Sequence, residues 1–202
     1  MPLLVSTSYF PPVAYIAGCI RTDEVILEAH ENDTKQTCRN HCSIYGPNGL
    51  QVLSVPVNKV NGNHTLITDI RISYSDPWQK MHRRSMESAY RNSPFFLYYQ
   101  DYFMPFYEKK VPFLFDLNLQ ILETVFRILR IERKISQTLS YERFPSDVTD
   151  QRELLVSKHH RGVMVPYTQV FGSRSGFLPD LSIIDLLFNL GPDSLEYLKK
   201  SA

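Results

Sequence analysis

Short apolar runs and polar turns alternate over the first 27 residues. Leu3–Val5 is apolar, Ser6–Pro12 is a polar turn, Val13–Ile20 is apolar enough for a helix, and Val25–Leu27 is a second apolar run. Strand, tight turn, helix and strand in this order predict a βαβ unit with parallel strands and a right-handed crossover. Ligands of such sheets bind beyond the carboxyl ends of the strands, so the unit directs attention to Ser6–Pro11 and to the segment after the second strand.

The pattern between residues 42 and 72 predicts further strands. Gly46-Pro47-Asn48-Gly49 is a strong turn signal between the apolar runs Cys42–Tyr45 and Gln51–Val57, so we expect a β-hairpin there. Ile67–Ile72 has the composition of another short strand. We expect Gln51–Val57 to join the same sheet as the two N-terminal strands.

The period then changes to that of helices. Asp76-Pro77 and Ser93-Pro94 are helix-start signals, and Phe113–Ile131 carries apolar residues at helical spacing. Five residues are predicted to share one face of the first helix: Trp78, Met81, His82, Ser85 and Ala89. Eight aromatic residues fall between Phe95 and Tyr107, and we interpret them as core rather than as a surface that stacks sugars.

The last third of the chain has fewer signals. Lys134–Leu139 is predicted to be a late strand, and Tyr141–Gly162 a loop with a short helix near Asp150–Ser157. Ser182-x-x-Asp185 is a capping box before the helix Ile183–Leu190, which Gly191-Pro192 ends. The whole pattern predicts one α/β domain over residues 1–202. Its parts are a mostly parallel central sheet, an N-terminal βαβ unit, a β-hairpin and a helical layer at about 76–131.

A polar segment between the second strand and the hairpin is the first candidate for a site. It carries long donors and imidazoles, which bind carboxylates, phosphates or sugar hydroxyls: His30, Glu31, Asn32, Lys35, Gln36, Arg39, Asn40 and His41. Functional residues are often found on loops between rigid strands. The alternative is a charged surface hairpin without a ligand.

Charge and hydropathy exclude several classes of protein. With 22 basic and 21 acidic residues the net charge is +1, so nothing indicates a nucleic-acid partner. No apolar run reaches the ~18 residues that a membrane span needs. Ile16-Ala17-Gly18-Cys19 resembles a lipoprotein cleavage box, but no basic residue precedes it and Pro11-Pro12 interrupts the apolar region. We therefore expect a cytoplasmic protein without stable membrane insertion.

Metal and cofactor signatures are weak. The chain has none of the common nucleotide, zinc-protease or hydrolase motifs, so no cofactor is predicted. Cys38-x-x-His41-Cys42 with His30 has a legal spacing for zinc, but the three cysteines, an odd number, are better explained as buried thiols. We expect neither a metal nor a disulfide at Cys38 and Cys42.

Several motifs are similar to those of one family over essentially the whole chain. They are Tyr9-Phe10-Pro11, Asp23, Lys35-Gln36-Thr37-x-Arg39-Asn40, Leu53-x-Val55-Pro56-Val57, Trp78-x-x-x-His82, Tyr90-x-x-x-Pro94-Phe95-Phe96, Pro166-Tyr167-x-Gln169-x-Phe171 and Leu181-Ser182-Ile183-x-Asp185-Leu186-Leu187-Phe188-Asn189-x-Gly191. With these blocks the chain resembles the WbqC-like family, bacterial proteins often encoded in O-antigen and other surface-polysaccharide clusters. The resemblance implies a glycyl or other small acyl transferase that acts on polysaccharide precursors. The chain departs from the family pattern at Thr7-Ser8, Cys38 and His41, which further weakens the metal interpretation.

The resemblance marks out candidate site residues. Lys35 and Arg39 are four apart and could clamp a carboxylate or the diphosphate of an activated sugar. Asn40 and Gln169 suit sugar hydroxyls or an amide. His82 is the preferred general base, although it could equally be a structural residue packed beside Trp78. The remaining candidates are Tyr9 and Tyr167, as walls of the site, and Asp185, which either orients a partner or caps its own helix.

Two classes of function remain open. The first is a transferase that modifies a nucleotide sugar or a glycan precursor, and the second is a binding or assembly protein of the same pathway. In both, Lys35, Arg39, Asn40, His82 and Gln169 are expected to converge on one cleft. The partner is then a small molecule, nucleotide sugar or glycan, and a homo-oligomer stays possible.

Overall fold

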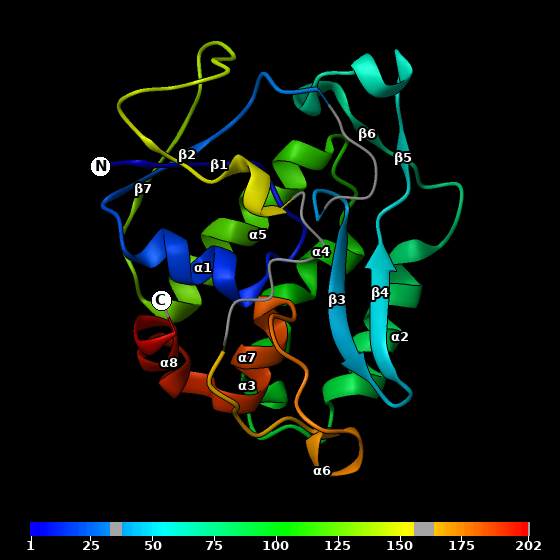
Figure 1. Cartoon of the computed structure of the whole chain (residues 1–202). Helices are drawn as coiled ribbons and strands as arrows, with labels where there is room; N and C mark the ends of the chain where they lie inside the picture. The colour runs from blue at the N-terminus through cyan, green and yellow to red at the C-terminus, as the bar shows by residue number, and fades with distance from the viewer. Residues whose placement is uncertain (33–37, 156–163, 202) are drawn as a thin grey trace.

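A parallel sheet of four strands contains the N-terminal βαβ unit in the computed structural model (Figure 1), which describes residues 1–32, 38–155 and 164–201. The strand order is β7 (Lys134–Gln137), β2 (Glu24–Leu27), β1 (Leu3–Val5), β8 (Thr149–Asp150). All three pairings are parallel, with Leu3 opposite both Val25 and Thr149. The predictions of an α/β fold and of a parallel sheet are confirmed.

Helix α1 (Val13–Ile20) forms the crossover between β1 and β2, as predicted. Six of its eight residues are buried, so this short helix needs neither a side-chain cap nor charged ends to be stable. It packs against α7 (Ile183–Leu190) and α8 (Ser194–Lys200), which brings the two ends of the chain together.

The predicted hairpin is present but does not belong to the parallel sheet. In the part of the chain that the structure describes, strands β3 (His41–Gly46) and β4 (Gly49–Ser54) pair only with each other, and β5 (Val57–Asn58) pairs with β6 (Arg71–Ile72). The prediction that Gln51–Val57 joins the central sheet is therefore wrong. Pro56 lacks a backbone N–H and lies at the break between β4 and β5.

Two other segments differ from their predicted structure. Within Ile67–Ile72, the first three residues form a 3₁₀ turn, η2 (Ile67–Asp69), and only β6 is a strand. The predicted helix near Asp150–Ser157 is instead the strand β8 followed by a 3₁₀ turn, η3 (Arg152–Leu155), as far as the described residues extend. The remaining 3₁₀ turns are η1 (Gly62–His64) and η4 (Gly191–Asp193).

The predicted helical layer consists of α2 (Trp78–Tyr90), α3 (Phe96–Phe103), α4 (Pro105–Glu108) and α5 (Leu114–Leu129). Pro105 begins the single turn α4 because proline fits the first position of a helix but not its interior. On α2, Met81 is 60% exposed, so it does not share the buried face of Trp78, His82 and Ala89. Within the described part of the chain, no helix has the length and apolar character that crossing a membrane requires.

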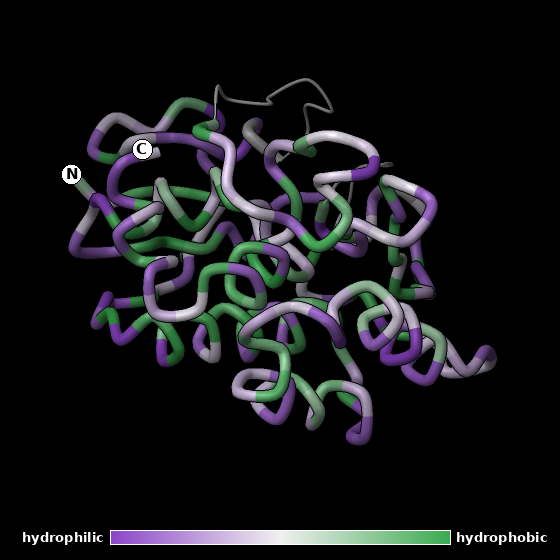
Figure 2. Tube along the Cα trace, turned by 90° about the horizontal axis from the view of Figure 1, so that it is seen from below, coloured by the Kyte–Doolittle hydropathy of each residue, from purple (hydrophilic) through white to green (hydrophobic). Residues whose placement is uncertain are grey.

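The aromatic residues of α3 and α4 contribute to the core in part. Phe96, Phe103, Phe106 and Tyr107 are buried, whereas Tyr98 and Tyr102 are exposed. Phe10 packs edge-on against Phe103 at 5.5 Å between ring centroids and adopts a left-handed φ of 42° to reach that place. In Figure 2 hydrophobic segments run through the middle of the trace, while many outer turns are hydrophilic.

The start of α7 fastens three parts of the chain to one another. Ser182 N donates to Ser43 O at 2.8 Å, and Ile183 N donates to Pro11 O at 2.8 Å. Val13 N in turn donates to Leu181 O at 2.9 Å. The turn after β1, the hairpin and the C-terminal helices therefore form one packed unit, with α6 (Gly172–Ser175) projecting at its lower end (Figure 1).

Candidate functional site

The carboxyl ends of the parallel strands carry a buried network of ionic side chains. Glu28 follows β2 directly and is fully buried. Its Oε2 accepts a hydrogen bond from Nη1 of Arg152 at 2.8 Å, and its Oε1 accepts one from the Thr138 hydroxyl at 2.7 Å. Thr138 follows β7, and Arg152 lies just after β8. Glu28 therefore links the ends of three strands.

A second ion pair lies beside the first. Arg39 donates from Nε to Oε1 of Glu31 at 2.8 Å and from Nη2 to Oε2 of the same carboxylate at 2.6 Å. The Ser6 hydroxyl, directly after β1, donates to Glu31 at 2.9 Å and lies 3.0 Å from Nη2 of Arg39. Arg39 is 2% exposed and Glu31 is 8% exposed. We call Ser6, Glu28, Glu31, Arg39 and Arg152 the edge network.

The charges of the edge network nearly balance. Asp150 also accepts from Arg152, at 2.7 Å, so among the described residues three carboxylates face two guanidinium groups, a difference of −1. The hydrogen bond from Arg152 lowers the pKa of Asp150, and the hydrogen bond to Asp150 raises the pKa of Arg152. Buried charges need such pairing because their desolvation is costly.

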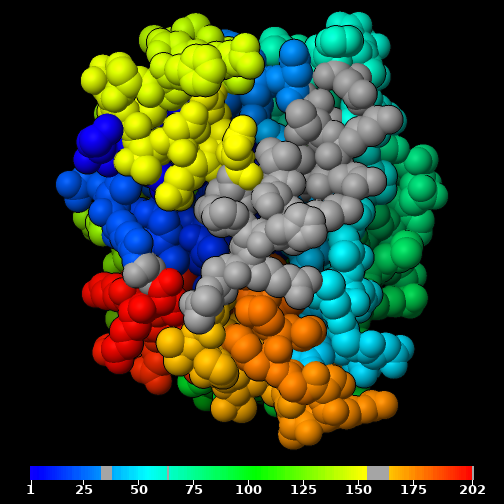
Figure 3. Space-filling model, in the orientation of Figure 1, coloured from blue at the N-terminus to red at the C-terminus, as the bar shows by residue number. Residues whose placement is uncertain are grey.

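A cavity of about 390 Å³ lies next to the edge network. Leu4 and Ile26 of the sheet form part of its wall. Its polar groups include Glu28 after β2, Ser136 of β7, and Thr138, Ser140 and Glu142 from the segment after β7. Its size is within the range typical of small-molecule sites. Residues 138–148 rise beyond the sheet, at the top of the molecule (Figures 1 and 3). Hydroxyl and carboxylate groups together suit a ligand that is rich in hydroxyls or carries an amine.

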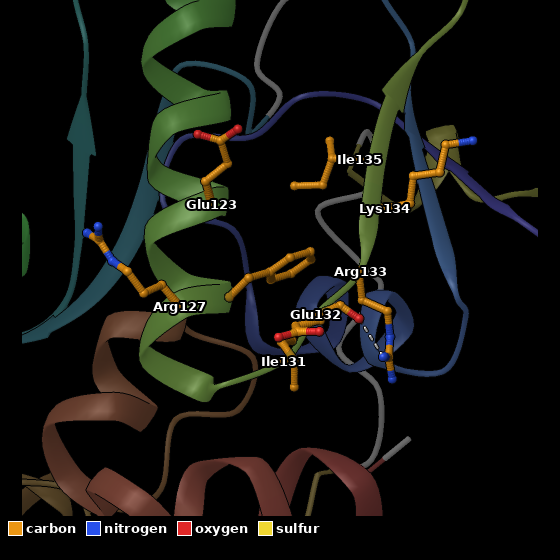
Figure 4. Close-up of a pocket in the computed structure, with 8 residues that line it drawn as sticks. Glu123, Arg127, Ile131, Glu132, Arg133, Lys134 and Ile135 are labelled. Carbon is orange, nitrogen blue, oxygen red and sulfur yellow. Dashed lines mark hydrogen bonds between the residues drawn. The ribbon is translucent and has the colours of Figure 1, made fainter.

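A larger hollow, about 560 Å³, lies at the opposite end of β7 (Figure 4). Glu123 of α5 and Ile135 of β7 face each other across it. Lys134 pairs with Glu24 at 2.8 Å, and Arg133 donates to the carbonyl of Ile20 at 2.9 Å. This hollow is at the amino end of the strand, where parallel sheets do not usually bind ligands.

His82 and Tyr9 form a buried pair away from the cavity lining. The Tyr9 hydroxyl lies 3.0 Å from Nδ1 of His82, and the His82 ring packs edge-on against Trp78 at 5.1 Å. Burial lowers the pKa of His82 to about 4, partly opposed by the backbone of Ser54. His82 is therefore neutral at pH 7 and a weak base, and its contacts match the structural alternative considered for it.

Tyr167, Gln169 and Asp185 form a third group. Asp185 accepts from the Tyr167 hydroxyl at 2.6 Å and from Nε2 of Gln169 at 2.9 Å. Burial raises the pKa of Asp185, and hydrogen bonds from Tyr167, Gln169 and Tyr90 partly offset this. The capping-box explanation for Asp185 is wrong, because its carboxylate binds these side chains while Ser182 caps the helix through the Ile184 amide.

Gln169 also closes a loop. Its Nε2 donates to Leu178 O at 2.9 Å, and its Oε1 accepts from Leu178 N at 2.9 Å. Tyr45 donates to the carbonyl of Gly176 at 2.8 Å within the same loop. Gln169 and Asp185 thus hold residues 169–178 against α7, and Tyr45 holds them against the hairpin.

Two predicted residues, Asn40 and Lys35, remain to be placed. Asn40 donates from Nδ2 to Val55 O at 3.1 Å, which links the residue before β3 to the residue after β4. Lys35 lies outside the described residues. Apart from Lys35 and Asn40, the predicted site residues fall into the edge network, the Tyr9–His82 pair and the Asp185 group, and of these only Arg39 belongs to the edge network. Their functional roles remain predictions.

Sequence reasoning missed Glu28 and Arg152. A glutamate directly after a buried strand was a usable signal for Glu28, since that position faces the site in parallel sheets. Glu31 was included in the polar segment without a role. Arg152 had no local signal, because it lies 124 residues from its partner Glu28.

The three cysteines are free thiols in this arrangement. Burial raises the pKa of Cys19, Cys38 and Cys42. Among the described residues, no group of three or more potential metal-ligating side chains is assembled.

A known family model matches most of the chain. The model of the WbqC-like protein family matches residues 7–161, more than three quarters of the chain. The chain belongs to the WbqC-like family. The match includes the edge network except Ser6, and it ends before the block Pro166–Gly191.

One relative extends the similarity to nearly the full length. The uncharacterised protein Rv1507c of Mycobacterium tuberculosis is 27% identical over 226 aligned residues, which cover 97% of this chain and 96% of that protein. Its name assigns no activity. No solved structure matches the chain.

Proposed function

We propose that this WbqC-like protein is a cytoplasmic transferase that acts on a nucleotide-sugar or glycan precursor in bacterial surface-polysaccharide synthesis, with glycyl or small acyl transfer as the reaction. The observation that carries the proposal is the edge network beside the 390 Å³ cavity, at the carboxyl ends of the parallel strands. In this fold class that edge is where substrates bind. The family resemblance supports the substrate class.

In the proposed transferase, hydroxyl and carboxylate groups of the cavity contact the substrate. Thr138 is oriented by its hydrogen bond to Glu28, and Ser136 and Ser140 lie on either side of it in the sequence. Glu142 has no hydrogen-bond or ion-pair partner among the described residues. Its carboxylate is therefore available to accept the proton of an attacking hydroxyl or amine.

The residues predicted from the family pattern take supporting roles in this proposal. Arg39 holds Glu31 and the end of β1 in place. Tyr9 and His82 support the turn after β1, and Gln169 and Asp185 support the loop 169–178. Lys35 keeps its predicted role as an anchor for an anionic group.

The experiment is a thermal-shift screen of purified protein against UDP-, GDP- and dTDP-sugars, glycine and acyl-CoA. A ligand that binds only the folded state raises its stability. For each ligand found, transfer to a sugar acceptor is then followed by mass spectrometry. Glu142→Gln should retain binding and lower turnover about 100-fold, the usual contribution of a general base. Glu132→Gln, an exposed glutamate on the other hollow, should change neither.

A non-catalytic binding protein of the same pathway is the second candidate. It is favoured by the pairing of Arg39 with Glu31 and of Arg152 with Glu28, which leaves the buried charges mutually compensated. Saturable binding without turnover under any tested combination of donor and acceptor would favour this candidate over the transferase.

A further inference from the structure

A hollow of about 650 Å³ lies far from the edge network in the fold, between α2, α3 and the turn before α6. It has no lining residue in common with the cavity at the carboxyl edge. Six residues define its chemistry: Arg84, Ser88, Arg91, Phe96, Gln100 and Phe171. We call it the α2–α3 groove.

Two arginines give the groove a positive charge. Arg84, Ser88 and Arg91 are spaced by four and three residues, so they lie on one face of α2 and its C-terminal end. Both arginines are exposed, and neither makes an ion pair with any described residue. Glu87 also lines the groove, but Arg83 pairs with it at 2.9 Å. The charge left in the groove is therefore that of Arg84 and Arg91.

The opposite wall is aromatic and held in place. Phe171 packs against the ring of Tyr45 at 5.7 Å, and the Tyr45 hydroxyl donates to the carbonyl of Gly176 at 2.8 Å. The clamp between Gln169 and Leu178 closes the same loop. A fixed aromatic wall, with the Ser88 hydroxyl and the Gln100 amide nearby, can pack against the apolar face of a sugar ring and bind its hydroxyls.

The spacing of the arginines indicates the size of the ligand. Seven helical residues correspond to a rise of about 10 Å between the backbone positions of Arg84 and Arg91. A single phosphate or a diphosphate is shorter than this, whereas charged groups on alternate rings of an acidic oligosaccharide are comparably separated. We propose that the α2–α3 groove binds an anionic oligosaccharide, with carboxylate or phosphate groups at Arg84 and Arg91. This inference does not depend on the proposed transferase activity.

Calorimetric titration with trigalacturonate at low ionic strength tests the inference. Wild-type protein should bind it saturably, and the double variant Arg84→Gln/Arg91→Gln should bind about tenfold or more weakly, since each charge-assisted hydrogen bond lost lowers affinity. Lys80→Gln, which removes an exposed charge on the same helix outside the groove lining, should stay within about twofold. Maltotriose, which has the same number of rings and no charge, should bind much more weakly.

Three results would overturn the inference. The first is the absence of saturable trigalacturonate binding by the wild type. The second is equal loss in Lys80→Gln and in the double variant, which would indicate a diffuse charge effect. The third is inorganic phosphate binding as tightly as trigalacturonate, which would reduce the groove to a simple anion site. Lys80, Arg84 and Arg91 are all exposed, and unchanged thermal unfolding of the variants would exclude misfolding.

Discussion

Arg39 and His82 are both buried and contact other side chains of the protein, unlike typical ligand-binding residues at a surface. The guanidinium of Arg39 spans both carboxylate oxygens of Glu31 and reaches Ser6 as well. His82 is enclosed by Tyr9 and Trp78. The family pattern identified both residues as important, and the contacts show a physical reason: each occupies a buried polar position that few other side chains could satisfy.

Replacing Arg39 should therefore be costly. Arg39→Ala leaves the Glu31 carboxylate buried without its partner, and we expect a loss of about 3–5 kcal/mol in the free energy of unfolding. Arg39→Lys keeps the charge but loses the bidentate geometry, and we expect about 2 kcal/mol. Urea unfolding measures both.

Arg83 provides the matched control. It pairs with Glu87 at 2.9 Å, but both side chains are more than 40% exposed. Arg83→Lys should therefore change stability by less than about 0.5 kcal/mol. Equal losses at Arg39 and Arg83 would contradict the buried-pair explanation.

The lowered pKa of His82 leads to a prediction about how stability depends on pH. Burial lowers it to about 4 in the folded protein, below the ~6.5 of an unfolded chain. The neutral form stabilises the fold above pH 6.5, and this contribution, up to about 3 kcal/mol, is lost as pH falls from 6.5 towards 4. Urea unfolding between pH 7.5 and 4.5 should show this decline in the wild type and a flatter profile in His82→Gln.

The shifted pKa values of Asp150 and Asp185 do not imitate this effect. The pKa of Asp150 is lowered by Arg152, so its contribution is lost only at more acidic pH. Burial raises the pKa of Asp185, which acts in the opposite direction by stabilising the fold as pH falls. Parallel profiles for the wild type and His82→Gln would show that His82 is not the titrating group.

At the scale of elements, prediction succeeded where the signal is local. The βαβ unit, the β3–β4 hairpin, α2, α5 and α7 each carry their own turn, start or stop residues, and all are present. The elements that were predicted wrongly are those that depend on pairing with residues far away in the sequence. Strand β8 has only two residues and exists because it pairs with β1, and Gln51–Val57 has a strand composition that does not specify its sheet.

Gly191 tests how α7 ends. It has a φ of 55°, and a Cβ at this position would overlap the ring of Phe95. Gly191→Ala should therefore lower the free energy of unfolding by about 3 kcal/mol or more, from backbone strain together with a clash with the Phe95 ring. Thermal or urea unfolding measures the loss.

Gly62 provides the control that separates backbone strain from the clash with Phe95. It has a similar φ of 56°, but nothing lies within 4 Å of its Cβ position. Gly62→Ala should cost only the backbone term, about 1–2 kcal/mol. If the two variants lose the same stability, the contact between Gly191 and Phe95 does not limit the end of α7.

At the scale of the whole molecule, the parallel sheet determines where the edge network forms. Glu28 and Arg152 are 124 residues apart, and Ser6 and Glu31 are 25 apart, yet the strand ends bring them together. Sequence reasoning predicted this edge as the ligand site from the βαβ unit alone. It could not identify Arg152 or the cavity residues after β7, because their proximity depends on strand pairings that no local pattern encodes.

Hydrogen–deuterium exchange, with and without the nucleotide sugar that gives the largest thermal shift, tests the central claim most directly. If the carboxyl edge is the substrate site, ligand should slow amide exchange in residues 136–142 and 28–31, which border the cavity. Residues 84–100, at the α2–α3 groove, should be unchanged by a mononucleotide ligand. Protection confined to residues 84–100, with none at 136–142, would contradict the placement of the substrate at the sheet edge.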